Sequence, residues 1–549
     1  MSSISSFEEI IRDGAVYVDK TEPIFRSFLK NADKYHFLVR PRRFGKSLLC
    51  STLANLFLGD EKLFQGLWIH GKWDFDKEKR YVIHIDMSIH PISESVKVFR
   101  RSVNDLLIDL AANLNIEIKI DLEDPPSIGL RKLLNLAHLK SGKQVVVIID
   151  EYDKQILDIV ENIDLREQIR VELQSFYGIL KGSSSNIRLV FITGMLKFSQ
   201  TSMFSTLNNL IDHSLRYDCG TICGYTEVEL KSYFSETIRY LSDIKKVSPN
   251  DLFKDLKLKY NGYSFGIGEC DTSETVYNPF QINSAFSLLD LETDFWSFSG
   301  SAELIYKVVQ ETGALLTGPK LTTLKTLRQS VQSIDNLSLE VLMFYGGYLT
   351  LKSYDKATGS ILLGVPNNQV RSILNDDLLL LLFKTNQITD TTSVIDLSNK
   401  LSSIISPKNF SVADTRILEE LFNQAIANTP YENLKTEDAF RNILDTILSM
   451  KFEDIRKETQ SSRGRSDTII RVQNSKGKVD KILIIEYKIE KKKKKSKNSG
   501  FSKATEKALD QIKQKGYDEP LRVYGVPIFG IGVVLTGEKK IHVLVEKLN

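Results

Sequence analysis

The chain has 549 residues, of which 42% are hydrophobic and 26% are charged, and its net charge is +3. This length exceeds one ordinary core and predicts two to four globular domains. No apolar stretch is long enough to span a membrane, residues 1–9 lack a signal-peptide pattern, and four cysteines are too few for a disulfide scaffold, so we expect an intracellular protein, cytoplasmic or, in a eukaryotic host, nuclear.

The first candidate site is the segment RPRRFGKS at residues 40–47. It follows an apolar run at 35–39 and precedes a helical pattern, which is the strand–loop–helix context of a P-loop. Backbone N–H groups at such a helix N-terminus bind phosphate, so Lys46 would reach the β- and γ-phosphates of a nucleotide and Ser47 would ligate Mg2+. Arg40 replaces the first glycine of the pattern, and either the extra arginines compensate with charge or the site has lost its activity.

A partner motif supports the P-loop interpretation. Residues 145–151 (VVVIIDE) form a continuous apolar run that ends in two acids, which predicts a buried parallel strand with ligands at its carboxyl end. Asp150 would hold the Mg2+ shell and Glu151 would polarise the attacking water. A third run, 189–192, ends at Thr193, a predicted sensor of the γ-phosphate. The alternative for the two acids is an ordinary strand end with solvated carboxylates.

The middle of the chain is mostly helical in pattern, with one predicted hairpin. Strand-like runs at 347–352 and 360–364 flank a turn-rich loop, and a helical segment at 337–344 precedes them. This arrangement resembles a winged-helix element, which would bind nucleic acid or pack against the P-loop domain, and we favour packing. Linkers are predicted at 402–407 and 429–430.

Near the C-terminus, Asp467, Glu486 and Lys488 form the pattern D-x18-E-x-K. Glu486 and Lys488 close an apolar run, and side chains two apart on a strand point to the same face. Two carboxylates hold a hard divalent cation, and a lysine beside them orients water or neutralises phosphate charge. This is the outline of a metal-dependent phosphodiesterase site. The alternative is an ordinary strand end with a surface ion pair.

Positive charge is concentrated beside this motif. Residues 471–520 hold 15 Lys/Arg against 7 Asp/Glu, a net charge of +8, which suits a polyanionic substrate. The lysine tract Lys491–Lys495 at its centre predicts a disordered loop, either functional or merely a solvated insertion.

The C-terminal region resembles the PD-(D/E)XK nuclease superfamily, with Ser466-Asp467 in place of the "PD" dipeptide. The resemblance implies an acidic cluster of Glu458, Asp467 and Glu486, a catalytic Lys488 and an accessory Gln511. The matching segments are 464–467 (GRSD), 485–488 (IEYK) and 508–517 (ALDQIKQKGY).

Most of the chain resembles the AAA-ATPase-like family whose members carry an RPRRFGKS loop and a C-terminal PD-(D/E)XK domain. In that family the first glycine of the loop is also missing. The matching segments are 17–21 (YVDKT), 149–154 (IDEYDK), 193–199 (TGMLKFS), 207–210 (LNNL), 260–263 (YNGY), 277–280 (YNPF), 347–350 (GYLT) and 365–370 (VPNNQV). The expected nucleotide-binding residues are Arg42, Arg43, Phe44, Gly45, Lys46, Ser47, Asp150 and Thr193, with Ser47, Asp150, Asp467 and Glu486 as metal ligands and Glu151 as the catalytic carboxylate that polarises water in the ATPase.

We therefore expect an α/β protein with a P-loop NTPase-like domain at 1–290, a helical, winged-helix-like middle at 291–425 and a restriction-endonuclease-like α/β domain at 426–549. The expected function is nucleotide-regulated cleavage of nucleic acid, DNA in first place, with ATP and Mg2+ (or Mn2+) as cofactors, no membrane partner, and a homo-oligomer as a compatible assembly. Two alternatives stay open. One is a decayed ATPase/nuclease fold that binds nucleic acid or protein. The other is an ATPase switch whose C-terminal domain does not cleave.

Overall fold

The computed structural model describes residues 6–88, 94–159, 162–197, 204, 207, 209–269, 271–293, 295, 320–328, 338–374, 400, 415–426, 434, 436–449, 452, 454–461, 464–473, 478–490 and 501–549. The chain divides into two compact units. The N-terminal unit comprises Met1–Ile305 and Leu321–Val370, and the C-terminal unit comprises Tyr306–Lys320 and Arg371–Asn549. The predicted linkers at 402–407 and 429–430 and the lysine tract at 491–495 lie outside the described residues.

The N-terminal unit is built on a parallel five-stranded sheet in the order β2-β3-β4-β1-β5. Every residue of β1 and β3 is buried, as expected for strands with helices on both faces. The strands predicted at 35–39 and 145–150 are confirmed. The strands are β1 (Tyr35–Val39), β2 (Val82–Asp86), β3 (Val145–Asp150), β4 (Ile187–Gly194) and β5 (Ile211–Asp212).

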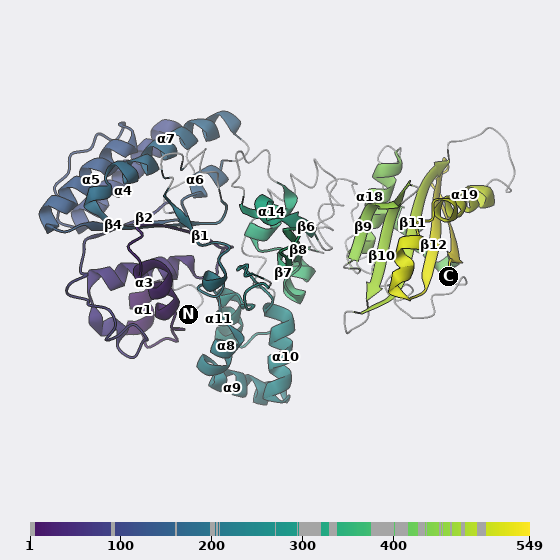
Figure 1. Cartoon of the computed structure of the whole chain (residues 1–549), viewed down its shortest axis with the longest axis horizontal. Coiled ribbons are helices and arrows are strands. Elements are labelled where there is room, and N and C mark those ends of the chain that lie inside the picture. The colour runs from purple at the N-terminus through teal and green to yellow at the C-terminus, as the bar shows by residue number, and fades with distance from the viewer. Residues whose placement is uncertain are drawn as a thin grey trace. The chain divides into compact units, whose positions relative to one another are not determined.

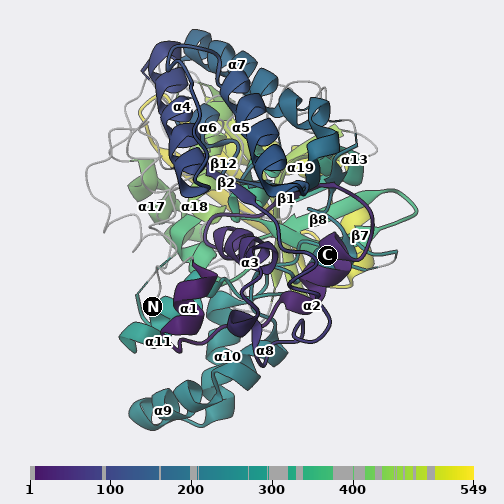
Figure 2. The same ribbon diagram turned by 90° about the vertical axis from the view of Figure 1, so that its left-hand side faces the viewer.

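Helices cover both faces of this sheet, with α4, α5 and α7 over one face and α1 and α3 over the other (Figure 1, Figure 2). Helix α3 begins directly after the P-loop, because Gly45 adopts a left-handed backbone conformation (φ 92°) that suits glycine and turns the chain into the helix. The helices of this part of the chain are α1 (Phe7–Arg12), α2 (Thr21–Ile24), α3 (Lys46–Leu58), α4 (Val96–Asn113), α5 (Pro126–Ser141), α6 (Lys154–Leu157) and α7 (Ile163–Gly182).

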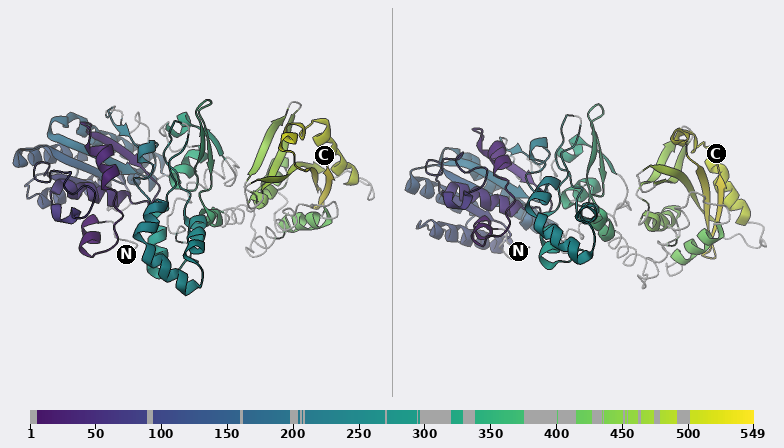
Figure 3. Two further views of the ribbon diagram at one scale, coloured as in Figure 1. Left: turned by 60° about the horizontal axis from the view of Figure 1, so that its bottom comes forward. Right: turned by 90° about the horizontal axis from the view of Figure 1, so that it is seen from below.

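A second group of helices follows the sheet in sequence and is seen as the teal bundle in Figure 3. Their apolar faces form one buried cluster that also takes in Val18, from the segment before α2. Helix α8 starts with a capping box, in which Thr226 and Glu229 satisfy each other's backbone N–H groups. The helices are α8 (Glu227–Tyr233), α9 (Ser235–Lys245), α10 (Pro249–Tyr260) and α11 (Pro279–Leu288).

The predicted hairpin is confirmed as the antiparallel pair β7 and β8, which with β6 forms a three-stranded sheet. It packs against the rest of the N-terminal unit, because Ser264 N donates to Thr350 Oγ1 (2.6 Å) and Asn367 Nδ2 donates to Asn261 O (2.8 Å). Gly262 (φ 101°) is required at this contact, because a Cβ atom there would lie 2.1 Å from Pro366 O. The elements are β6 (Lys320–Thr323), α13 (Leu324–Arg328), α14 (Leu339–Gly346), β7 (Thr350–Asp355) and β8 (Ser360–Gly364).

The C-terminal unit holds a mixed sheet in the order β13-β12-β11-β10-β9, in which only β11 and β12 run parallel. Helix α19 packs on the face that carries Ile482 and Ile484, and α18 lies on the opposite face. The apolar runs at 468–472 and 482–485 are confirmed as strands. The elements are α17 (Thr415–Ile426), α18 (Glu437–Ser449), β9 (Asp454–Ser461), β10 (Gly464–Gln473), β11 (Val479–Glu490), α19 (Phe501–Gln514), β12 (Ile528–Thr536) and β13 (Ile541–Lys547).

Candidate active sites

The predicted phosphate-binding residues meet at the carboxyl edge of the parallel sheet. Lys46 is buried at the start of α3, with its Nζ 3.3 Å from Pro41 O and 3.4 Å from Glu151 Oε1. The buried hydroxyl of Thr193, at the end of β4, has no hydrogen-bond partner within the described residues. A buried polar group of this kind is costly unless a ligand satisfies it, so the edge is suited to a polar ligand.

Asp150 lies at the end of β3, buried and hydrogen-bonded to Ser47. Burial raises the pKa of Asp150 to about 6, and the neighbouring Glu151 adds to that effect. The serine hydroxyl and the aspartate are an oxygen pair of the kind that holds Mg2+ in a P-loop site. Lys46, Ser47, Asp150, Glu151 and Thr193 therefore form one cluster, as the sequence analysis requires.

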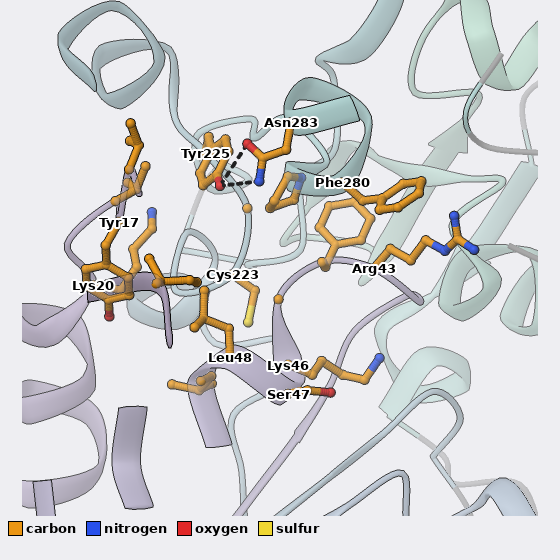
Figure 4. A pocket seen from close by; sticks show the side chains of 18 of the residues that line it. Tyr17, Lys20, Arg43, Lys46, Ser47, Leu48, Cys223, Tyr225, Phe280 and Asn283 are labelled. Atoms are coloured by element: carbon orange, nitrogen blue, oxygen red, sulfur yellow. Dashed lines mark hydrogen bonds between the residues drawn. The ribbon is translucent and has the colours of Figure 1, made fainter. Parts of the chain in front are cut away.

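A cavity of about 580 Å³ opens beside this cluster, within the range of small-molecule sites. Figure 4 shows Lys46 and Ser47 on one side of it and the hydrogen-bonded pair Tyr225 and Asn283 on another. The Arg43 guanidinium, which also lines it, stacks 4.0 Å over the ring of Phe280. The cavity thus combines the predicted phosphate-binding residues with an apolar and amide surface.

Phe44 and Arg42, two further residues predicted to bind the nucleotide, do not line the cavity in the same way as Arg43. Phe44 is completely buried and packs edge-on against Tyr263 and Phe265, so it anchors the loop from inside. Arg42 lies in the same loop and is half-buried.

Arg40, at the position of the missing glycine, is buried and points away from the phosphate cluster. Its guanidinium donates to Val39 O (2.9 Å), Ser214 O (2.8 Å) and Cys219 O (2.8 Å), and it stacks 4.6 Å over Phe265. Arg40 thus fixes the loop to residues 214–219 and does not itself supply compensating charge to the phosphate cluster, and the activity of the site stays a prediction.

Replacing Arg40 with glycine should destabilise the N-terminal unit instead of restoring a standard P-loop. The change deletes three hydrogen bonds of a buried charged donor, and we expect the free energy of unfolding to fall by about 3–5 kcal/mol. Denaturant unfolding would measure this, with Arg12→Ala, at an exposed ion pair with Glu8, as the control of small effect. Unchanged stability combined with lost nucleotide affinity would instead place Arg40 on the phosphates.

Sequence reasoning missed two acids at the same edge. Asp153 is fully buried and accepts hydrogen bonds from the N–H groups of Met195 and Leu196, which joins the turn after β3 to the end of β4. Burial, helped by Glu151, raises the pKa of Asp153 to about 7. Asp86 ends β2 and lies opposite Asp150 in the sheet register. The only sequence signal for Asp86 is that the apolar alternation of 82–86 ends in an acid.

In the C-terminal unit, the register of β10 and β11 places Asp467 directly opposite Glu486, next to the pair of Thr468 and Ile485. Glu486 is 1% exposed, and its Oε1 accepts hydrogen bonds from Gln511 Nε2 and from Lys488 Nζ (3.1 Å). Asp467 Oδ2 accepts from the N–H of Tyr487 (2.8 Å). Two carboxylates, a lysine and an amide therefore converge at one point of the sheet.

This arrangement fits a divalent cation. The other carboxylate oxygen of Glu486, Oε2, is buried and has no hydrogen-bond partner among the described residues. Burial, together with the charge of Asp467, raises the pKa of Glu486 to about 7. A cation held by Asp467 and Glu486 would satisfy the unpaired oxygen and relieve this repulsion.

Glu458 lies on β9, and the pairs of Ser466 with Thr459 and of Thr468 with Lys457 place it opposite Asp467. Its side chain lies outside the described part of the chain. Its participation therefore stays a prediction.

Two residues of α18 were missed by sequence reasoning, because they lie more than 20 positions before the motif. Arg441 Nη1 is 3.5 Å from Asp467 Oδ1, and Arg441 also pairs with Asp438. Asp445 is buried and accepts hydrogen bonds from Tyr487 Oη (2.7 Å) and Thr468 Oγ1, so it fixes the strand residues next to both carboxylates.

Glu486→Gln should stabilise the metal-free protein at alkaline pH. Because the pKa of Glu486 is raised from 4.5 to about 7, the folded protein binds this proton more tightly than the unfolded chain. The stability it contributes is present below pH 4.5 and is lost as the pH rises through about 7. In EDTA at pH 8 we expect the glutamine variant to be more stable than wild type by about 1–3 kcal/mol, and the difference to shrink towards pH 5. Denaturant unfolding at several pH values would show this, and a difference that is constant with pH would contradict it.

Comparison with known proteins finds two family models in this chain. Residues 2–204 match the family described as predicted AAA-ATPase, and residues 435–544 match the PD-(D/E)XK nuclease superfamily. Each match contains the corresponding site: the first covers Lys46 and Asp150, and the second covers Asp467 and Glu486.

An "uncharacterized protein in vnfD 5′ region" from Azotobacter chroococcum mcd 1 is 29% identical over 547 residues, which cover 98% of this chain and 96% of that protein. The solved Aeropyrum pernix ORC2 protein (ADPNP–ADP complexes) matches with a TM-score of 0.23 and 10% identity, over 68% of this chain and 93% of that chain. No helix in the described ranges is long and apolar enough to cross a membrane. The chain is an α/β protein that joins an AAA-ATPase-like domain to a PD-(D/E)XK nuclease-superfamily domain.

Proposed function

We propose that this protein is a Mg2+-dependent nuclease, acting on DNA in first place, whose N-terminal domain binds ATP and regulates cleavage. The observation that carries the proposal is the convergence of Asp467, Glu486 and Lys488, with one buried oxygen of Glu486 left unpaired in the described structure. The net charge of +8 over residues 471–520 supports a polyanionic substrate.

In the nuclease site, Asp467 and Glu486 would hold Mg2+ (or Mn2+), with Glu458 as a further acid. The bound ion supplies Lewis-acid stabilisation of the charge on the phosphate. Burial disfavours charge on Lys488, but Glu486 beside it outweighs this and holds the pKa of Lys488 above its usual range. Lys488 therefore acts as a cation that donates hydrogen bonds to water or phosphate, and not as a general base.

Gln511 has a positioning role in this proposal. Its amide donates to Glu486 Oε1, as does Lys488, and this leaves Oε2 for the cation. The amide thereby keeps the glutamate in one orientation without adding charge.

In the ATPase domain, Lys46 and Ser47 would bind the phosphates and Mg2+ of ATP, with Asp150 holding the ion and Thr193 contacting the γ-phosphate. Lys46 now lies 3.4 Å from Glu151 Oε1. Phosphate binding would draw Lys46 from this contact and release Glu151 to orient the attacking water. The proposal further includes domain boundaries near residues 290 and 425 and a homo-oligomeric assembly.

Incubation of the purified protein with DNA and RNA, with and without Mg2+ or Mn2+ and with and without ATP, tests the proposal. Metal-dependent cleavage by wild type that Asp467→Asn lacks would support it. Equal binding of nucleic acid by both proteins, with no cleavage by either, would favour a binding module with a decayed site.

Lys46→Ala should change the rate of nucleic-acid cleavage in the presence of ATP, although Lys46 lies outside the nuclease domain. A nucleotide can shift the cleavage-competent state only by its differential affinity, and such coupling is typically about 1–3 kcal/mol, or roughly 5- to 150-fold. Cleavage rates of full-length wild type, Lys46→Ala and the surface control Lys62→Ala, with and without ATP, would measure it. Identical rates under all conditions would leave two uncoupled domains.

A further inference from the structure

Three side chains of different chemistry meet beneath the P-loop helix. Cys50 comes from α3, His84 from β2 and Asp150 from the end of β3, and one donor atom of each lies within 4.8 Å of the other two. They are 34 and 66 positions apart in the sequence, so the parallel sheet and the helix over it create the cluster.

Within the described ranges, the two softer donors of this cluster make no hydrogen bond. Cys50 is a free, fully buried thiol, and the Nε2 atom of His84 is buried without a hydrogen-bond partner among the described residues. Asp150 uses Oδ1 to accept from the N–H of Glu151. An ordinary core cysteine needs no partner, but a buried imidazole nitrogen without one is costly, and a ligand at this point would remove the cost.

The donor set defines the class of ligand. Sulfur, imidazole nitrogen and carboxylate oxygen together suit Zn2+ and related transition metals, whereas Mg2+ takes oxygen ligands. Three protein ligands leave a fourth tetrahedral position for water. We propose that Cys50, His84 and Asp150 form a Zn2+-type metal site, which shares only Asp150 with the expected Mg2+ site of the nucleotide.

Metal binding at this site releases one proton. The Cys50 thiol gives its proton to solvent and its sulfur binds the metal as thiolate, while His84 binds through a nitrogen of the neutral imidazole. No redox change is required.

If the N-terminal domain binds ATP as proposed, metal binding at this site should interfere with it. Asp150 is shared, because it is also the expected ligand of the nucleotide's Mg2+ beside Ser47. A metal held by Cys50 and His84 draws the carboxylate away from that role, so the metal and Mg2+-ATP should compete.

Cobalt(II) is the appropriate probe, because thiolate ligation gives a charge-transfer absorption that oxygen-only sites such as Asp467 and Glu486 do not give. Full-length protein stripped with EDTA should bind one Co2+ with this absorption. Cys50→Ser should lose the absorption. Loss of a residue that only hydrogen-bonds to a metal ligand lowers metal affinity by about 10- to 100-fold. His84→Gln removes a ligand itself, so it should weaken Co2+ binding by more than this.

The matched control is Cys219→Ser, because Cys219 Sγ lies 3.6 Å from His213 Nδ1 and is the rival sulfur–nitrogen pair. This variant should keep the absorption, and so should the triple variant Cys219→Ser/Cys223→Ser/Cys270→Ser, whose one remaining thiol is Cys50. The triple variant keeps the test valid if Cys50→Ser folds poorly. Absorption that survives in Cys50→Ser, or is absent from the folded triple variant, overturns the site.

The competition has its own readout. Excess Mg2+-ATP should lower the apparent Co2+ affinity of wild type. If ATP binds but leaves the Cys50-dependent absorption unchanged, the shared use of Asp150 is wrong. If the absorption is absent while ATP binds normally, the metal site is wrong and the proposed ATP binding stands.

Discussion

Asp467→Asn should reduce Mg2+-dependent cleavage of nucleic acid by about 10³-fold or more, because a metal ion contributes several kcal/mol of charge stabilisation to phosphate chemistry. The asparagine still accepts the hydrogen bond from Tyr487 N–H through its oxygen, so the strand pairing should persist. The substitution removes the negative charge that faces Glu486 on the neighbouring strand. Initial cleavage rates and Mn2+ or Mg2+ titration on the same samples would measure the effect.

Substitutions at the other site residues should separate loss of metal binding from loss of the chemical step. Glu486→Gln should behave like Asp467→Asn, whereas Lys488→Ala should keep the metal and lose the chemistry, since Lys488 contacts the carboxylate and not the expected ion. Asp510→Asn, which changes an exposed residue of the neighbouring α19, is a matched control that should cleave like wild type. Equal cleavage by all of these proteins would place the activity elsewhere or in a contaminant.

Lys46→Ala should weaken ATP binding by about 2–5 kcal/mol, or roughly 30- to 5,000-fold in Kd, because it removes a buried charged partner of the phosphates. Isothermal titration with Mg2+-ATP would measure this, with Lys62→Ala as the exposed control. Lys46 is buried inside the loop, with its ammonium against Pro41 O, so the substitution removes its charge directly from the loop.

Glu151→Gln separates binding from hydrolysis. The glutamine no longer pairs ionically with Lys46, so ATP affinity should be kept or increased, while hydrolysis should be lost with the group that orients the water. If wild type shows no affinity for ATP or GTP at millimolar concentration with Mg2+, the ATPase part of the proposal is wrong.

The sequence by itself determined the local units of both sites. The apolar run of β3 ends at Asp150, the last residue of that strand, which places the carboxylate at the carboxyl edge of the sheet, and strand alternation puts Glu486 and Lys488 on one face. The hairpin of β7 and β8 followed from its turn residues. These are short-range properties, in which spacing along the chain sets the direction of each side chain.

Only the tertiary structure decided which distant residues complete the sites. Strand register set Asp467 against Glu486 and Asp86 beside Asp150, and helix packing brought Arg441 and Asp445 to the nuclease strands. The role of Arg40 was also hidden, because its partners are backbone carbonyls around residue 214, which carry no side-chain signature in the sequence. The cluster of Cys50, His84 and Asp150 was hidden too, because the packing of α3 on the sheet brings these donors together while their spacing in the chain follows no metal-binding pattern.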